Sequence, residues 1–383
     1  MAEPFALYLH VPYCRHVCPY CDFNVQAAAH PPEARYAAAL ATELAAGAAR
    51  EPWRGRRVKT VFLGGGTPSL FSPAAIGEIL TAVARCFEVV GGAEITLEAN
   101  PGTVSHTTLA GYRAAGVNRV SLGAQSFHPH LLRTLGRDHG RDDVAAAVEA
   151  ARAAGFANLS LDLIFGVPGA TLADWDADLA HALALAPAHV STYALTFEPG
   201  TPFHTWRAQG RLHPVDEDLE ARMTDLACER LGAAGYERYE ISSYARPGFA
   251  ARHNLSYWDG SDYLGLGAGA HSFSQHPTPG VRSVNERSPE RYLVAVETGG
   301  TAAASIEPLT DATARAEFCL TGLRQIAGID VASFRRRFGT ELAAAFPHVS
   351  GLIGDGLLDL AGDRLRLTPR GLAFADTVSA TFV

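Results

Sequence analysis

Three of the six cysteines lie close together near the start of the chain, at Cys14, Cys18 and Cys21. Three thiolates on one loop can hold three irons of a cubane iron–sulfur cluster and leave the fourth iron open to another ligand. The alternative is a structural zinc ion with His10 or His16 as the fourth ligand. Structural zinc sites usually take ligand pairs from two separated segments, and the sequence has no second pair. The spacing therefore favours a cluster over zinc.

The other cysteines, Cys86, Cys228 and Cys319, stand alone in segments of helical period, and we expect packed thiols there. The composition is that of an ordinary globular protein, with 48% hydrophobic and 19% charged residues. A net charge of −8 gives no support to nucleic-acid binding through bulk positive charge. We find neither a long apolar run nor a signal segment, so we expect a cytoplasmic protein.

The elements that position the cysteines follow an alternating pattern of short apolar runs and alanine-rich segments, which is typical of parallel β/α units. The expected strands are Phe5–His10, Thr60–Leu63, Glu94–Glu98, Arg119–Gly123, Asn158–Ile164 and His189–Leu195. The expected helices are Pro32–Ala49, Ser72–Cys86, Ser105–Ala115, Asp142–Ala154, Thr171–Ala186 and Asp216–Ala234. Six such units predict a full or partial barrel, and a doubly wound sheet is the alternative with the same pattern.

The pattern changes past residue 240, so we predict three segments: a core barrel at 1–240, a glycine- and aromatic-rich segment with a linker at 241–289, and a C-terminal domain at 290–383. The last segment reads as short helices followed by a hairpin around Gly362 and Asp363, an order that resembles a winged helix. Its Arg335–Arg337 run is typical of a solvated helix face, and we expect no nucleic acid as a partner.

Several expected strands end in residues suited to binding. The second ends in Gly64-Gly65-Gly66-Thr67-Pro68, where glycines let the backbone approach a ligand closely. Later strand ends carry Glu98, Gln125 and Asp162. In a barrel, ligands gather where strands end, and a polar side chain in an apolar strand needs a partner that a ligand can supply.

With these features, the Cys-x-x-x-Cys-x-x-Cys loop resembles that of the radical SAM superfamily, whose members bind S-adenosylmethionine on the open iron of a 4Fe-4S cluster and cleave it reductively. Over nearly the whole chain the likeness is to the oxygen-independent coproporphyrinogen III oxidase family. The resemblance implies SAM contacts at Tyr8, Tyr20, Gly65, Gly66, Thr67, Glu98, Gln125, Arg137, Asp162, Thr196 and His271. Thr196 and His271 stand where the oxidase has alanine and isoleucine.

Within that family the chain is most similar to the heme chaperone branch. Phe23 replaces a further cysteine of the oxidase, and the first strand begins at Phe5, without the oxidase's N-terminal arm. The sequence His253-Asn254-Leu255-Ser256-Tyr257-Trp258 resembles the branch's heme motif. From the residues alone, packing and loop capping are the more common role of such a segment. The resemblance implies His253 as the heme ligand, with Tyr257 and Trp258 in its pocket.

The resulting hypothesis is a heme chaperone that passes heme to acceptor hemoproteins such as membrane respiratory enzymes, with a 4Fe-4S cluster, SAM and heme as cofactors. The resemblance implies that the cluster and SAM favour a homodimer. The alternatives are coproporphyrinogen decarboxylation, another radical SAM reaction, or a zinc-stabilised barrel without redox activity.

Overall fold

The computed structural model describes residues 3–383, and its main feature is one curved sheet of twelve strands. Six parallel strands at its centre neighbour one another in chain order. They are β1 (Phe5–Val11), β4 (Arg57–Gly65), β5 (Glu88–Ala99), β6 (Arg119–Gln125), β7 (Asn158–Phe165) and β8 (His189–Ala194). A doubly wound sheet reverses its strand order at a switch point, and this sheet does not. The predicted partial (β/α)6 barrel is therefore confirmed.

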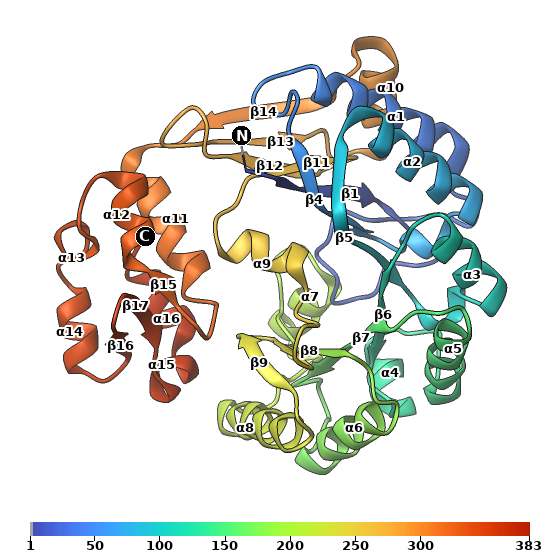
Figure 1. Cartoon of the computed structure of the whole chain (residues 1–383). Coiled ribbons are helices and arrows are strands. Elements are labelled where there is room, and N and C mark those ends of the chain that lie inside the picture. The colour runs from blue at the N-terminus through green and yellow to red at the C-terminus, as the bar shows by residue number, and fades with distance from the viewer. Residues whose placement is uncertain (1–2) are drawn as a thin grey trace.

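Helices cover the convex side of this sheet, as Figure 1 shows for α1, α2, α3, α5, α6 and α8. The helices after the six strands are α1 (Glu33–Ala48), α2 (Pro73–Cys86), α3 (His106–Ala114), α4 (Pro129–Thr134), α5 (Arg141–Ala153), α6 (Leu172–Ala184), α7 (Pro202–Ala208) and α8 (Glu217–Ala233), with short turns η1 (Pro68–Leu70) and η2 (Pro101–Thr103). Ser72, Ser105, Thr171 and Asp216, the expected first residues of α2, α3, α6 and α8, are N-caps with non-helical backbone. Within residues 3–383 no helix has the length and apolar character needed to cross a bilayer.

Alternation along the strands separates an apolar outer face from a polar inner face. Outward residues such as Leu9, Leu97 and Leu161 are fully buried in the main hydrophobic core with the helices. The residues next to them, such as Glu98 and Asp162, face the inside of the barrel. Closed barrels of this type usually fill their interior with branched aliphatic side chains, so polar residues there indicate a binding cavity.

Past residue 236 the chain adds strands to both edges of the barrel wall. β9 (Glu237–Glu240) and β10 (Ser243–Ala245) extend the β8 edge, and the chain then crosses to the β1 edge through α9 (Arg252–Trp258). There β11 (Tyr263–Leu266) pairs in parallel with β1. Antiparallel strands β12 (His271–Ser274), β13 (Val281–Asn285) and β14 (Ala303–Pro308) follow, with α10 (Pro289–Gly299) before β14.

The C-terminal domain is a set of short helices around a small sheet, β15 (Ile329–Asp330), β17 (Arg364–Leu367) and β16 (Leu358–Ala361). Its helices are α11 (Asp311–Gly322), α12 (Val331–Phe338), α13 (Leu342–Ala345), α14 (Val349–Gly354), α15 (Pro369–Ala373) and α16 (Ala375–Ala380). The hairpin expected around Gly362 is β16–β17. Residues 290–308 were expected in this domain, but they belong with the barrel. Their strand β14 joins the large sheet by pairing with β13, and their helix α10 packs on α1.

Candidate functional site

The cysteine loop leaves β1 at the end of the barrel where the parallel strands finish. The strand pair β2 (Tyr13–Cys14) and β3 (Gln26–Ala27) closes the base of the loop. Cys14 Sγ accepts a hydrogen bond from Thr67 Oγ1 at 3.4 Å, and Cys18 Sγ accepts one from Arg137 Nη1 at 3.5 Å. Donors aimed at sulfur stabilise the thiolate form, which is the form that binds iron.

Burial raises the pKa of Cys14, although the bond from Thr67 opposes the shift, and burial raises the pKa of Cys21 to about 11. These two thiols are therefore protonated at neutral pH when no iron is bound, and metal binding must release their protons.

The glycine turn after β4 is packed directly against the cysteine loop. Gly66 N–H donates to the Val11 carbonyl at 2.9 Å, and a Cβ atom at Gly66 would lie 2.7 Å from the Tyr13 carbonyl oxygen. Gly65 has a φ of +109°, and a Cβ there would lie 2.4 Å from the His10 ring. Larger residues would push the cysteine loop away, so the glycines are required for packing as well as for access to a ligand.

One cavity of about 540 Å³ brings the three cysteines together with most of the predicted SAM residues. It is lined by Cys14, Cys18, Cys21, Tyr20, Gly65, Gly66, Thr67, Glu98, Gln125, Arg137, Asp162 and Thr196, among others. Tyr8 and His271 line a second, adjoining cavity, which shares Gly65 and Glu98 with the first. The donor set of three thiols and the hydrogen-bond donors Thr67 and Arg137 fits an iron–sulfur cluster at this position.

The zinc alternative finds less support in the histidines. His10 Nε2 donates to the Asn24 carbonyl at 2.8 Å, and Tyr8 Oη lies 2.9 Å from His10 Nδ1, so both ring nitrogens are engaged. His16 Nε2 donates to the Gly136 carbonyl at 2.7 Å, which leaves Nδ1, and that atom faces Asp138 at 3.8 Å. His16 Nε2 also lies 3.9 Å from Cys18 Sγ, but its bond to Gly136 occupies it, so neither histidine presents a free ring nitrogen to the three sulfurs.

Two half-buried carboxylates, Glu98 and Asp162, lie on the inner face of the barrel and line the cavity. Burial, reinforced by the charge of Asp162, raises the pKa of Glu98 to about 7, and the Gly65 N–H bond of 3.0 Å opposes this shift. Burial also raises the pKa of Asp162, against hydrogen bonds such as that from Ser121. A cationic or hydroxyl-bearing ligand would relieve the cost of these charges.

Replacing Glu98 with glutamine should remove part of the pH dependence of stability. Between about pH 4.5 and pH 7 the folded protein keeps a proton on Glu98 that the unfolded chain has released, so the free energy of unfolding falls as pH rises through this window. Glu98→Gln should lack this loss and be more stable than wild type at about pH 8, on the order of 2 kcal/mol. Chemical unfolding of the cluster-free protein at both ends of the window measures it. The exposed Glu229→Gln is the control, and parallel pH profiles for wild type and Glu98→Gln would contradict the assignment.

Gln125 is the last residue of β6, and Arg137 lies in the loop between α4 and α5. Gln125 has a φ of +64°, an uncommon conformation for a residue other than glycine and one that concentrates at functional sites. Arg137 Nη2 donates to the Gly123 carbonyl at 3.1 Å, while Nη1 reaches Cys18. Arg137 thus connects the strand that carries Gln125 with the cysteine loop.

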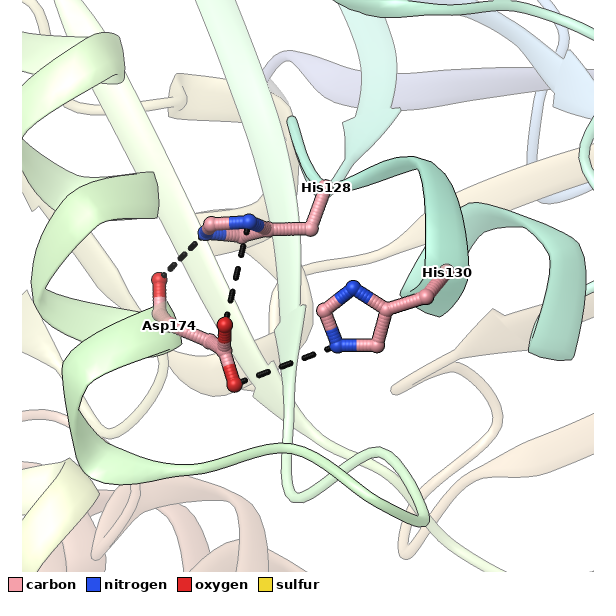
Figure 2. Close-up of side chains that lie close together, drawn as sticks. All are labelled: His128, His130 and Asp174. Carbon is pink, nitrogen blue, oxygen red and sulfur yellow. Dashed lines mark hydrogen bonds and ion pairs between the residues drawn. The ribbon is translucent and has the colours of Figure 1, made fainter.

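The segment between β6 and α5 is attached to α6 by three side chains of the kinds that bind metals, His128, His130 and Asp174, shown in Figure 2. His128 Nδ1 lies 3.8 Å from Asp174 Oδ1, His130 Nε2 lies 3.9 Å from Asp174 Oδ2, and His128 Nε2 donates to the Asp174 carbonyl at 3.0 Å. Asp174 also caps α6 through Thr171. These contacts restrain the segment between Gln125 and Arg137.

The segment predicted to bind heme forms α9 in the opening of the barrel, with His253 fully buried. His253 Nδ1 lies 2.9 Å from Thr60 Oγ1 of β4, and Nε2 lies 2.8 Å from Tyr257 Oη. Burial, with Lys59 and Arg119 nearby, lowers the pKa of His253 to about 3, so the imidazole is neutral. Neutral imidazole is the ligating form, but a ligand reaches Nε2 only after Tyr257 releases it.

Glu94, which was not among the predicted site residues, holds the first turn of α9 in place. Both of its carboxylate oxygens accept N–H bonds at 3.0 Å from the first turn of α9, at Arg252 and His253. A carboxylate satisfies N–H groups of a helix start that otherwise have no partner. The signal was available, since Glu94 is an acidic residue within an expected strand.

Comparison with protein families matches residues 8–182 to the Radical SAM superfamily and residues 309–374 to the HemN C-terminal domain. Curated relatives include three proteins named heme chaperone HemW. The one from Bacillus subtilis is 35% identical over 98% of both chains, and the one from Escherichia coli is 36% identical over 99% of this chain and 98% of its own. The one from Mycobacterium tuberculosis is 39% identical over 100% of this chain and 95% of its own.

Among solved structures, coproporphyrinogen III oxidase (HemN) from Escherichia coli, a radical SAM enzyme, superposes with a TM-score of 0.84. The match covers 99% of this chain and 90% of the oxidase at 23% identity. At this identity the likeness establishes a shared fold, including the C-terminal domain, and leaves the reaction open.

Proposed function

Because the chain belongs to the heme chaperone HemW family of the radical SAM superfamily, we propose that it binds heme and passes it to acceptor hemoproteins. The observation that carries the proposal is the position of α9. Its Tyr257 borders both the cavity beside the SAM residues and a larger apolar cavity beyond it, and its hydroxyl is bonded to His253. A heme in either cavity would meet the motif that the resemblance assigns to heme.

The cysteine loop would hold a 4Fe-4S cluster on Cys14, Cys18 and Cys21, with SAM beside it. When bound, the cluster supplies an open iron that takes the amino and carboxylate groups of SAM. Thr67 and Arg137 donate to two of the sulfurs and orient the loop. Glu98 and Asp162 offer half-buried acceptors to the ligand in the same cavity.

Acceptors of the heme would be hemoproteins such as membrane respiratory enzymes, and the protein would act in the cytoplasm. The cluster-loaded form would favour a homodimer. Decarboxylation of coproporphyrinogen is the alternative from the same fold. It is disfavoured because Phe23, whose side chain is exposed, stands at the position of the oxidase's further cysteine.

The proposal is tested by titrating heme into the anaerobically reconstituted protein, with and without SAM, and then adding a heme-free acceptor hemoprotein. We expect a saturable Soret band that moves from the chaperone to the acceptor. A coproporphyrinogen assay on the same sample should give no product. Failure to bind heme, or decarboxylation of coproporphyrinogen, would overturn the proposal.

A further inference from the structure

A cavity of about 820 Å³ lies between α9 and the C-terminal domain. Figure 1 shows α11 facing α9, and the two helices are in contact. Aromatic residues lie on both sides of the cavity: Tyr257, Trp258, Tyr263 and Phe273 on the barrel side, and Phe318, Phe346 and Phe382 on the other. Its size falls in the range typical of cofactor sites, and facing aromatic walls suit a flat apolar body.

Arg337 is an unpaired cation in this cavity. Its neighbours in the arginine run are exposed and paired, Arg335 with Glu341 and Arg336 with Asp330. Arg337 instead lies against the rings of Phe273, Phe318 and Phe338, 5.0–5.8 Å from their centroids. No carboxylate of residues 3–383 lies within ion-pair distance of it. The run that the sequence analysis assigned to a solvated face therefore has one member turned inward.

Two further donors on the cavity residues lack an acceptor. Within the described chain, Trp258 Nε1 and Arg315 Nε are both buried without a hydrogen-bond partner. Buried donors are nearly always satisfied in native proteins, so an exception indicates a missing partner. Burial lowers the pKa of Arg337, although the charges of Asp262 and Glu317 oppose the shift, which marks a partly desolvated cation. The cavity thus combines an apolar body with unsatisfied N–H donors and a cation, which the oxygens of a carboxylate would satisfy.

We propose that this cavity is the seat of heme, with Arg337 binding a propionate and the aromatic walls enclosing the ring. The inference rests on the proposed function and gives the C-terminal domain a role in it. Heme matches the cavity because it is a flat apolar macrocycle with two carboxylates, and both Arg337 and Arg315 lack a carboxylate partner. Tyr257 forms part of the wall, so the ring would lie on the residue that covers His253.

The experiment compares heme with heme dimethyl ester, in which both carboxylates are masked, by Soret titration of full-length variants. Arg337→Gln should weaken heme binding about tenfold, as expected for a buried charged hydrogen bond, and leave ester binding unchanged. The matched control is Arg336→Gln, at the exposed neighbouring residue of the same arginine run, which should bind both ligands like wild type. Ala312→Trp, at an exposed helix position on the cavity wall, should weaken both ligands by obstructing the seat.

The outcomes separate the two proposals. If wild type binds no heme, the proposed function fails. If wild type binds heme and neither Arg337→Gln nor Ala312→Trp changes the affinity, the function stands and the seat is elsewhere. An equal loss for heme and ester in Arg337→Gln would also overturn the propionate contact. Ala312→Trp keeps the seat testable should Arg337→Gln fail to fold.

Discussion

Alanine at Cys14, Cys18 or Cys21 is expected to abolish cluster assembly. Anaerobic reconstitution of the wild type should give about four irons and four sulfides per chain. Each single variant should give almost none, because one of the three protein-bound irons of the cubane loses its thiolate ligand. Iron and sulfide analysis together with the visible absorption band measures the result. The loss of the cluster should be close to complete, which makes it the largest effect expected from removing a single sulfur atom.

The matched control is Cys86→Ala, in which a half-buried thiol at the end of α2 is removed far from the loop. Its cluster content should equal that of wild type. Cys319 is a poorer control, because it is fully buried in the C-terminal core and its loss would lower stability. Retention of a full cluster by any of the three loop variants would refute the ligand assignment, and zinc in place of iron would revive the structural alternative.

His253→Ala is expected to weaken heme binding at least tenfold or to shift the Soret band, because the iron loses its proposed axial ligand. The variant also leaves Thr60 Oγ1 and Tyr257 Oη without their partner in a buried place, which should cost about 2–4 kcal/mol of unfolding free energy. Soret spectra must therefore be read beside thermal unfolding. His276→Ala, at an exposed site, is the control.

Tyr257→Phe tests whether His253 is the heme ligand and Tyr257 only occupies its Nε2 atom. If His253 Nε2 binds iron, removing the hydroxyl that occupies it should speed heme uptake and keep the final spectrum. Burial raises the pKa of Tyr257 well above its usual value, so the phenol stays protonated and is a poor anionic ligand. An unchanged Soret band in His253→Ala would contradict the assignment, and His271, which lines the adjoining cavity, would be tested next.

The sequence was sufficient for the barrel, and it predicted that the cysteines and the strand-end residues lie together, because both depend on local patterns. Short apolar runs and alanine-rich helices located the six central parallel strands, and the residues at strand ends meet in one cavity because parallel strands finish at the same edge. The errors at helix starts were single residues, since Ser72 and Thr171 accept from the helix as caps without joining it.

Features that depend on distant pairing were beyond sequence reasoning. The strands β11–β14 join the barrel edge beside β1, more than 250 residues away along the chain, and nothing in their short sequences specifies that partner. Arg337 could not be separated from Arg335 and Arg336 by composition, because only the packing of α12 on α11 turns it toward Phe318. The burial of His253 likewise follows from the path of α9 across the barrel opening.

The contact between Thr60 and His253 would couple the two proposed ligands, SAM and heme. Thr60 belongs to β4, the strand that ends in the Gly64–Gly66 turn of the predicted SAM cavity, and His253 belongs to the helix beside the proposed heme seat. A heme that draws His253 out of its bonds must change what β4 contacts. Because linked binding equilibria are reciprocal, the factor by which heme changes the dissociation constant of SAM equals the factor by which SAM changes that of heme. The affinity for heme would then depend on whether SAM is bound.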